Sequence, residues 1–444
     1  MDCLRMTGGV PLRGTVSVGG SKNAALPIMA AALLADGPVK LCGVPRVADV
    51  DTLALLLGHL GVETKRDRDG HVHLATVDPR PIKADYELVR RMRASFCVLG
   101  PLVARRGRAV VSLPGGCNIG TRPVDLHLRG LEGLGATVRI EHGYVVAEAR
   151  RLVGTTIDLS GPCGPSVTGT ANVMAAAALA HGRTVITSAA REPEVADLGQ
   201  FLNGLGAKIS GLGTATIEIE GVERLGGGEH HVIRDRIEAG TLLIAAAITR
   251  GEATVDGADE TQLRCVLDAL TEGGVEISLV PGGVAAGVSR RGRPLHITAR
   301  PYPGIPTDLQ AQFMALTCVA DGRSTIRDAV FPDRLMHVAE LNRLGARIRR
   351  RGATAEVDGV SRLSGATIMA SDLRASAALV LAGLAAKGET VVRRVYHLDR
   401  GYERLEHKLA HLGARIVREP DDERLPVAEP PDSALVAPDY APPR

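Results

Sequence analysis

The feature of this sequence that most constrains its fold is a unit that occurs six times. Each copy has an opening glycine, a short apolar stretch, a polar loop, an amphipathic stretch and a second apolar stretch, as in "ADGPVKLCGVPRVADVDTLALLLGHLGVE". The opening glycines recur at intervals of roughly 70 residues, which is longer than the period of the common solenoid repeats. They are Gly37, Gly107, Gly182, Gly251, Gly322 and Gly388. Each unit is therefore expected to be a small subdomain with its own strands and helices.

A stretch that is apolar on nearly all sides precedes each copy, which is typical of a helix buried inside a domain. We expect such helices at residues 21–35, 89–104, 164–180, 234–249, 306–320 and 371–386. Each unit then consists of a strand, a buried helix, a strand, an exposed helix and closing strands. Six βαβαββ-like units in two groups of three predict an α/β fold with two pseudo-threefold domains, helices inside and sheets outside.

The domain boundaries follow from the same grouping. Residues 22–231 are expected to form the domain that carries the loop around Cys117. The other domain is expected to be discontinuous, with residues 1–21 and 232–420, because the strands between Met1 and Gly20 are predicted to pair with the last repeat. Residues 421–444 are rich in proline and charge, and we expect a disordered tail.

Composition excludes several classes of protein. The net charge of +3 gives no basic footprint for nucleic acid. The apolar runs are shorter than the roughly 20 residues of a membrane span. Seven widely spaced cysteines argue against a disulfide framework or a zinc site and favour a reducing cytoplasm. We also expect no metal at His71 and His73, or at His230 and His231, which have no Cys or acidic partner at ligand spacing.

Charged and polar residues recur at equivalent places in this apolar scheme. A helix N-terminus offers free N–H groups and a positive dipole, and arginine or lysine there strengthens the preference for anions. We therefore predict a cationic cleft between the two domains. The starts of the buried helices carry Lys22, Asn23, Arg93, Ser95, Ser166, Arg236, Glu238, Asp308, Asp372 and Arg374, and the loops ahead of exposed helices carry Arg122, Arg334 and Arg400.

Cys117 lies in the glycine-rich stretch "PGGCNIG", close to Arg122. Cationic neighbours lower the pKa of a thiol and make it reactive, and the glycines allow the backbone to move. Cys97 and Cys318 lie inside apolar helices, where an inert buried thiol is expected. Cys117 is therefore the predicted functional thiol.

Several long motifs occur in one order along nearly the whole chain, among them "GGSKNAALPIMAA", "SLPGGCNIGTRPVDLHL", "GPSVTGTANVMAAA", "PTDLQAQF", "SDLRASAALVLAG" and "YHLDRGYERLEHKL". From Met1 to about Arg418 the sequence resembles the UDP-N-acetylglucosamine 1-carboxyvinyltransferase family of enolpyruvyl transferases. The resemblance implies an inside-out α/β barrel. It also implies a reaction in which a sugar hydroxyl adds to C2 of phosphoenolpyruvate and phosphate then leaves, with no metal or organic cofactor.

The resemblance also implies roles for individual residues. Asp308 would be the general base, and Cys117 the lid residue that forms an adduct with phosphoenolpyruvate and is alkylated by fosfomycin. Asn23 and Asp372 would face the sugar hydroxyl and the intermediate. Phosphoenolpyruvate would be held by Lys22, Asn23, Arg122, Arg334, Arg374 and Arg400. The nucleotide sugar would be held by Asp308 and by Arg93, Arg122, Pro123, Val124, Asp125, Leu126, Ser166, Val167 and Thr168.

Two positions depart from the family pattern and bear on the acceptor. Gly164 stands where several members carry a lysine, and Arg234 stands where a proline is common. The acceptor could thus be another uridine nucleotide, such as uridine monophosphate in nucleoside-antibiotic biosynthesis. A non-catalytic regulator that binds nucleotide sugar is a further alternative. The sister 5-enolpyruvylshikimate-3-phosphate synthase is disfavoured by the cysteine loop and by "GSKNAALP".

Overall fold

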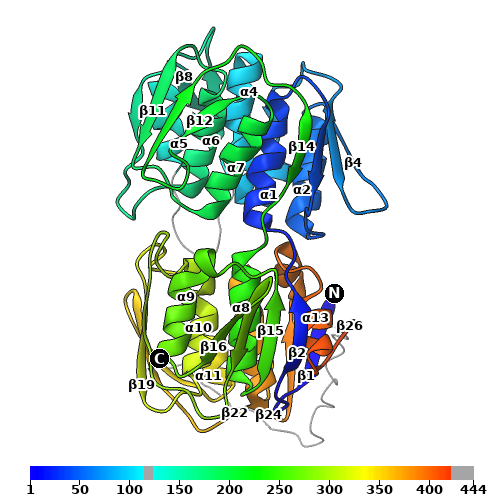
Figure 1. The fold of residues 1–444 in the computed structure, drawn as a ribbon, viewed down its shortest axis with the longest axis vertical. Helices are drawn as coiled ribbons and strands as arrows, with labels where there is room; N and C mark the ends of the chain where they lie inside the picture. Colours follow the sequence, from blue (N-terminus) through cyan, green and yellow to red (C-terminus); the bar gives the residue numbers. More distant parts are fainter. Residues whose placement is uncertain (115–123, 422–444) are drawn as a thin grey trace, which may run out of the picture.

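The computed structural model describes residues 1–114 and 124–421. Its buried apolar residues form two separate cores. The first core contains residues between Ala24 and Val232, and the second contains residues between Leu4 and Val18 together with residues between Ile237 and Ile416. Figure 1 shows the corresponding two halves of the molecule stacked along its long axis. We refer to them as the first half and the second half.

The described residues form six four-stranded sheets of one design, three in each half. An edge strand runs parallel to its neighbour, and the other pairs are antiparallel. The first half contains β14 (Gly228–His231)-β3 (Val39–Cys42)-β5 (Val72–Thr76)-β4 (Val62–Arg66), β6 (Lys83–Ala84)-β7 (Arg108–Ser112)-β9 (Tyr144–Glu148)-β8 (Thr137–Glu141) and β10 (Thr156–Asp158)-β11 (Arg183–Thr187)-β13 (Thr216–Glu220)-β12 (Lys208–Ser210).

The second half repeats this design. It contains β2 (Arg13–Ser17)-β15 (Glu252–Asp256)-β17 (Gly283–Gly287)-β16 (Glu276–Val280), β18 (His296–Ala299)-β19 (Arg323–Asp328)-β21 (Thr354–Asp358)-β20 (Arg347–Arg351) and β23 (Thr367–Met369)-β25 (Glu389–Arg393)-β1 (Asp2–Thr7)-β26 (Arg415–Pro420). A two-stranded sheet joins β22 (Leu363–Ser364) to β24 (Ala386–Lys387).

When units are counted from one opening glycine to the next, the parallel edge strand of each sheet lies outside the unit of the strand that it pairs with, and this closes each half into a ring. In the first half β14, at the end of the third unit, pairs with β3 of the first unit. In the second half β2 fills the same place beside β15 of the fourth unit. The prediction that the strands of Met1–Gly20 pair with the last repeat is therefore confirmed for β1, which lies between β25 and β26, and wrong for β2.

Six helices lie inside the rings and six lie nearer the surface. The inner helices are buried on nearly all sides because their sequences are almost entirely apolar. They are α1 (Lys22–Ala31), α4 (Leu99–Arg106), α6 (Val167–Ala177), α8 (Arg236–Ile248), α10 (Gln310–Thr317) and α12 (Leu373–Ala385). Short 3₁₀ turns, η2 (Arg93–Val98) and η3 (Thr307–Leu309), precede α4 and α10, and η1 (Ala32–Leu34) follows α1.

The outer helices pack one apolar face on the rings. They are α2 (Ala48–His59), α5 (Asp125–Gly133), α7 (Pro193–Gly204), α9 (Glu260–Glu272), α11 (Val338–Arg343) and α13 (Leu405–His411), and the short α3 (Tyr86–Val89) precedes η2. The expected arrangement of helices inside and sheets outside is confirmed. Within residues 1–114 and 124–421, the helices are too short or too polar to cross a membrane.

The opening glycines are needed for two backbone reasons. Four of the six have positive φ, between +71° at Gly107 and +127° at Gly322, a region that other residues rarely adopt. The other two lie against backbone. A Cβ on Gly251 would be 1.9 Å from the carbonyl oxygen of Leu12, and one on Gly37 would be 3.0 Å from the amide nitrogen of Gly227. The repeated glycine thus marks the turn at which each unit enters its central strand.

The chain crosses between the halves twice, and the two crossings pair with each other. Ser21 donates its amide to Ile233 at 2.7 Å, and Asp235 donates its amide to Gly19 at 3.0 Å. Directly after these crossings Ser21 caps α1 and Asp235 caps α8 through their side-chain oxygens. The connection fixes the N-termini of α1 and α8, one from each half, at the junction (Figure 1).

Candidate functional site

The Asp49 carboxylate joins two of the predicted phosphate-binding cations. Lys22 Nζ lies 2.7 Å from Asp49 Oδ2, and Arg400 Nε lies 2.9 Å from Asp49 Oδ1. Lys22 begins α1 and Asp49 lies in the first turn of α2, both in the first half, whereas Arg400 ends η4 (Val395–Arg400) in the second half. The structure therefore brings Lys22 and Arg400 together, as predicted, with a carboxylate between them that the sequence analysis did not identify.

The Asp308 carboxylate, the predicted base, is bound by three side chains. Arg334 Nη1 donates to Oδ1 at 2.8 Å, and Arg374 Nη2 donates to Oδ2 at 2.9 Å. Asn23 Nδ2 donates to Oδ2 at 3.2 Å across the junction between the halves. Three residues predicted for the same site as Asp308 thus bind its carboxylate.

Burial alone would raise the pKa of Asp308, but Arg374 and Arg334 outweigh burial and hold the pKa of this carboxyl well below its usual range. Burial lowers the pKa of Lys22, while Asp49 favours its charged form. In this arrangement Asp308 is a weak base. It becomes a stronger one only when something else occupies the guanidinium groups that hold it.

Arg374 is positioned by a buried polar group beneath it. Its guanidinium lies over the Tyr402 ring at 5.2 Å, and it is 1% exposed. The Tyr402 hydroxyl lies 3.0 Å from Thr241 Oγ1 and accepts from Gln312 Nε2 at 3.1 Å. Within the described part of the chain, Nε and Nη1 of Arg374 have no hydrogen-bond acceptor. Two buried donors on a fixed cation are suited to an anionic ligand.

Asp372 caps α12, because its Oδ1 accepts from the amides of Arg374 and Ala375 at 2.9 and 3.2 Å. Arg334 Nη2 lies 3.9 Å from the same oxygen. Burial lowers the pKa of the adjacent His337 to about 4, although Asp372 acts in the opposite direction. Asp372 therefore lies beside the group of side chains that surrounds Asp308.

The residues predicted for the nucleotide form a second group on η2, α5 and α6 of the first half. Asp125 and Leu126 begin α5, Val124 precedes it, and Arg93 begins η2. Ser166 caps α6 and accepts from the Gly169 amide at 3.1 Å. Thr168 Oγ1 lies 3.2 Å from His127 Nε2, and His127 Nδ1 accepts from Asn172 at 2.9 Å. Cys117, Arg122 and Pro123 lie outside the described residues.

A second contact between the halves was also missed by the sequence analysis. Arg236, at the start of α8, makes a bidentate pair with Glu194 of α7 at 2.9 and 3.2 Å, and both side chains are buried. The Arg236 guanidinium also lies 5.4 Å from the Tyr302 ring, and Tyr302 donates its amide to Glu192 at 3.2 Å. Burial raises the pKa of Glu192.

The repeat carries a signal that would have found these acids. Asp49, Glu194, Arg334 and Arg400 each lie twelve residues after the opening glycine of their unit. Two of the three units in the first half therefore carry an acid at this position, and two of the three in the second half carry a cation. All four lie at starts of outer helices or in the preceding turns, and each of them pairs with a charged residue of another element.

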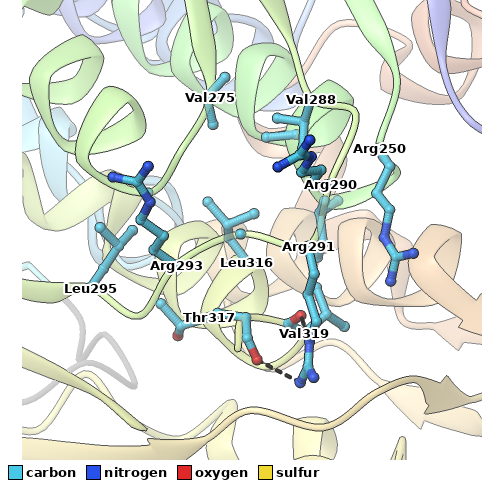
Figure 2. Close-up of a pocket in the computed structure, with 15 residues that line it drawn as sticks. Arg250, Val275, Val288, Arg290, Arg291, Arg293, Leu295, Leu316, Thr317 and Val319 are labelled. Atoms are coloured by element: carbon cyan, nitrogen blue, oxygen red, sulfur yellow. Dashed lines mark hydrogen bonds between the residues drawn. The ribbon is translucent and has the colours of Figure 1, made fainter. Parts of the chain in front are cut away.

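A separate cavity of about 20 Å³ lies inside the second half (Figure 2). Arg250, Arg290, Arg291 and Arg293 surround it, and Arg291 donates to the carbonyls of Val319 and Ala320 at 2.9 and 2.6 Å. A space of this size holds about one water molecule. We therefore interpret Arg291 as a cap for the carbonyls that follow α10, and we do not interpret the cavity as a substrate site.

Comparison with known proteins gives a consistent result. Residues 6–409 match the family model of EPSP synthase (3-phosphoshikimate 1-carboxyvinyltransferase). The chain is 55% identical over 94% of its length to the UDP-N-acetylglucosamine 1-carboxyvinyltransferase of Anaeromyxobacter sp. (strain Fw109-5), all of which is covered. It is 54% identical over 94% of its length to that of Anaeromyxobacter sp. (strain K), of which 99% is covered.

Two solved structures are similar to this structure. The enolpyruvyl transferase NikO from Streptomyces tendae has a TM-score of 0.84 and 29% identity, covering 94% of this chain and 98% of its own. EPSP synthase from Acinetobacter baumannii has a TM-score of 0.69 and 18% identity, covering 95% of this chain and all of its own, and this likeness concerns the fold alone.

Proposed function

The chain belongs to the EPSP synthase family of enolpyruvyl (1-carboxyvinyl) transferases, and from this premise we propose that it transfers the enolpyruvyl group of phosphoenolpyruvate to the 3-hydroxyl of UDP-N-acetylglucosamine. This is the first committed step of peptidoglycan precursor synthesis. The observation that carries the proposal is the Asp308 carboxylate, held at the junction by Asn23 of one half and by Arg334 and Arg374 of the other.

The reaction requires a base, an acid and cations. A carboxylate takes the proton of the sugar hydroxyl while the hydroxyl oxygen bonds to C2 of phosphoenolpyruvate. An acid protonates C3. Phosphate then leaves from C2, and C3 gives up a proton so that the double bond forms again. We assign the first proton to Asp308 and the protonation of C3 to Cys117, which lies outside the described residues. By the same resemblance Cys117 is the residue that fosfomycin alkylates.

The geometry supports a mechanism by which the binding of phosphoenolpyruvate makes Asp308 a stronger base. The carboxylate of phosphoenolpyruvate can accept from the unused Nε and Nη1 donors of Arg374 and compete for Arg334. Each guanidinium that turns to the substrate removes an interaction that keeps the pKa of Asp308 low. We infer that phosphoenolpyruvate raises the basicity of Asp308 as it binds.

The phosphate is assigned to Lys22, Arg400 and Arg122. Lys22 and Arg400 already share the Asp49 carboxylate, so the distance between them suits a bridging anion. A phosphate dianion carries more charge and more acceptor atoms than a carboxylate, and it would displace Asp49 from both cations. Asp372 is assigned to the sugar hydroxyl and the intermediate.

The nucleotide is assigned to the second group, with Arg93 and Arg122 for its diphosphate and the α5 and α6 starts for the uridine. Ser166 and Thr168 are each held by a hydrogen bond to a neighbouring residue, which supports a rigid binding surface at the start of α6. The proposed domains are residues 1–21 with 232–420, and residues 22–231, and the two separate cores support this division. The six described cysteines are free, which supports a bacterial cytoplasmic location.

Another uridine nucleotide, such as uridine monophosphate, is the second candidate acceptor. The identity to NikO is 29%, whereas the identity to the UDP-N-acetylglucosamine 1-carboxyvinyltransferase of Anaeromyxobacter is 55%, and this higher identity supports the nucleotide sugar as the acceptor. Phosphate release from phosphoenolpyruvate, measured with UDP-N-acetylglucosamine, uridine monophosphate and shikimate 3-phosphate in parallel, distinguishes them. We expect turnover with the first. Turnover with uridine monophosphate alone would reassign the acceptor, and no turnover with any would favour a regulator.

A further inference from the structure

Three potential metal ligands meet on the outer face of the sheet β14-β3-β5-β4, away from the site described above. They are Cys42 at the end of β3, and Glu229 and His231 on β14. The parallel register places His231 opposite Cys42 and Glu229 opposite Lys40. Residues two apart on a strand share a face, so the register brings all three side chains to the same side of the sheet. Sequence spacing could not show this, because Cys42 belongs to the first unit and the other two to the third.

The distances between the ligand atoms fit a tetrahedral metal site. Cys42 Sγ lies 3.3 Å from Glu229 Oε1, and His231 Nε2 lies 3.6 Å from the same oxygen. With ordinary zinc bond lengths and a tetrahedral angle, the S···O and N···O separations come to about 3.6 and about 3.4 Å. The three ligand atoms all lie within 4.8 Å of one another. Small rotations of exposed side chains would complete the geometry.

The surroundings hold the carboxylate in the required orientation. Lys40 Nζ lies 3.3 Å from Glu229 Oε2, so the lysine engages one oxygen and leaves Oε1 directed toward Cys42 and His231. Cys42 is buried, whereas the side chains of Glu229 and His231 are 49% and 78% exposed. A metal ion can therefore enter from solvent and reach a thiol beneath it. A hydrogen bond to the other oxygen of a ligating carboxylate is the usual outer support of a metal site.

We propose that Cys42, Glu229 and His231 bind a transition-metal ion, with Zn²⁺ as the preferred ion and a water molecule as the fourth ligand. When the metal–sulfur bond forms, the Cys42 thiol releases its proton to solvent, and neutral His231 and ionised Glu229 bind without a change of charge. Thiolate, imidazole and carboxylate together favour Zn²⁺ or Co²⁺ over Ca²⁺ and Mg²⁺, which prefer oxygen ligands.

The position of this site gives the metal a structural role. The pairing of β14 with β3 is the contact that closes the first half into a ring. The next residue after β14, Val232, donates its amide to the carbonyl of Cys42 at 3.0 Å, and the chain then crosses to the second half. A metal bound by Cys42 and His231 would join the two strands at the ring closure and stabilise the first half.

A nearby cluster is the main competing location. Asp67, Asp69 and His71 also lie close enough to hold an ion, and Asp67 Oδ2 lies 2.9 Å from His73 Nε2. This cluster contains no sulfur atom. Binding there would lack the sulfur-to-metal absorption band that a thiolate ligand gives with Co²⁺, so spectroscopy separates the two locations.

The test uses the full-length protein after treatment with a chelator. Zn²⁺ affinity is measured by competition with a chromophoric chelator, Co²⁺ binding by its absorption spectrum, and stability by thermal unfolding with and without Zn²⁺. We expect binding of one Zn²⁺ at this site, a thiolate band with Co²⁺, and a higher unfolding temperature with metal. Cys42→Ser and His231→Ala should each weaken Zn²⁺ binding by at least about tenfold and remove the metal-induced rise. Cys42→Ser should also remove the band.

Two matched variants serve as controls. Cys163→Ser changes another cysteine, an exposed one outside the cluster, and His71→Ala changes the histidine of the competing cluster. Both should retain the Zn²⁺ affinity and the Co²⁺ band. Circular dichroism of each metal-free variant establishes that it is folded. Absence of Zn²⁺ binding by the wild-type protein, a thiolate band that persists in Cys42→Ser, or loss of binding in His71→Ala alone would overturn the proposal.

Discussion

At the scale of single residues, the contacts of Asp308 separate binding from chemistry. The Asp308→Asn variant keeps the shape of the side chain but removes the proton acceptor. Turnover should fall by about a hundredfold or more, while the affinity for UDP-N-acetylglucosamine stays within a few-fold. Steady-state kinetics and equilibrium binding of the nucleotide sugar measure the two effects. A turnover within a few-fold of the wild-type value would mean that another residue is the base.

His337 gives the second half a dependence on acidity. Its pKa in the folded protein is about 4, below the ordinary value of 6.5, because burial disfavours the charged ring. Between these two values the unfolded chain binds more protons, so the free energy of unfolding should fall as the pH is lowered through this window, by at most about 1.4 kcal/mol per pH unit from this residue.

The His337→Gln variant removes this titration. Urea unfolding at several pH values between about 4 and 6.5 should show a shallower loss of stability in the variant than in the wild type. Protonation of carboxylates such as Asp308 lowers the free energy of unfolding in both proteins. The difference between the two proteins therefore reports the histidine alone. Equal slopes would show that His337 is charged in the folded protein.

Sequence reasoning was most effective for residues at the starts of elements and least effective for their partners. It identified Lys22, Asn23, Asp308, Arg334 and Arg374 as candidates for one site, and the structure brings these residues together. It missed the acid Asp49, because an acidic residue in a first helical turn is ordinary on its own. The prediction that Cys97 and Cys318 are inert is supported, since burial raises the pKa of both to about 12.

At the scale of elements, two aspartate caps test how the junction uses the helix starts. Asp235 Oδ1 accepts from the Ile237 and Glu238 amides at 2.8 and 3.0 Å, and it is buried. Asp259 caps α9 in the same manner, but it is exposed. Asp259→Ala should lower the free energy of unfolding by about 1 kcal/mol, and Asp235→Ala by about 2 kcal/mol or more, because buried amides then lose their acceptor.

Urea unfolding of the two variants under one condition measures this difference. Asp235 also accepts from the Lys22 amide at 3.4 Å, so its removal disturbs both α8 and α1. The Asp259→Ala variant controls for the loss of an ordinary cap. If Asp235→Ala lowers the free energy of unfolding no more than Asp259→Ala does, the crossing is held by its backbone contacts alone.

Most of the helices and strands could be predicted because the same order of apolar and polar stretches recurs in six segments. The inner helices were located from their apolar sequences, and the structure has five of them within the expected ranges, while α4 ends two residues beyond its range, at Arg106. The pairing of β2 could not be predicted, because its sequence specifies a strand but not which ring it closes. The opening glycines, in contrast, are explained by backbone geometry that a sequence alone only suggests.

At the scale of the whole molecule, the pair between Glu194 and Arg236 holds the two halves together. Glu194→Gln leaves the Arg236 cation buried without a full charge partner, which costs about 3–5 kcal/mol. Separation of the two halves relieves this cost, because water then hydrates the cation. We expect small-angle scattering of the variant to give a larger radius of gyration, and UDP-N-acetylglucosamine to reduce it again.

Two further variants test this interpretation. Glu260→Gln breaks an exposed pair with Arg264 within α9 and should leave the scattering curve unchanged. The double variant Glu194→Gln with Arg236→Met removes both buried charges and should restore the compact form in part. Identical curves for Glu194→Gln and the wild type would mean that the pair does not control closure.

The interleaving of the two chain ends also determines when each half can be completed during synthesis. The first half is built from one continuous segment. In the second half, β1 can pair only after β25 has been synthesised, because Thr7 of β1 lies opposite Glu389 of β25. At about 5–20 residues per second, the ribosome needs roughly 20–80 s to add the intervening segment. During that interval the nascent N-terminus carries an apolar strand without its final neighbours, and the completed first half grows out beside it. The order of synthesis therefore makes the first half the scaffold on which the second is assembled, and a circularly permuted gene that starts at the second crossing, near Val232, would reverse that order.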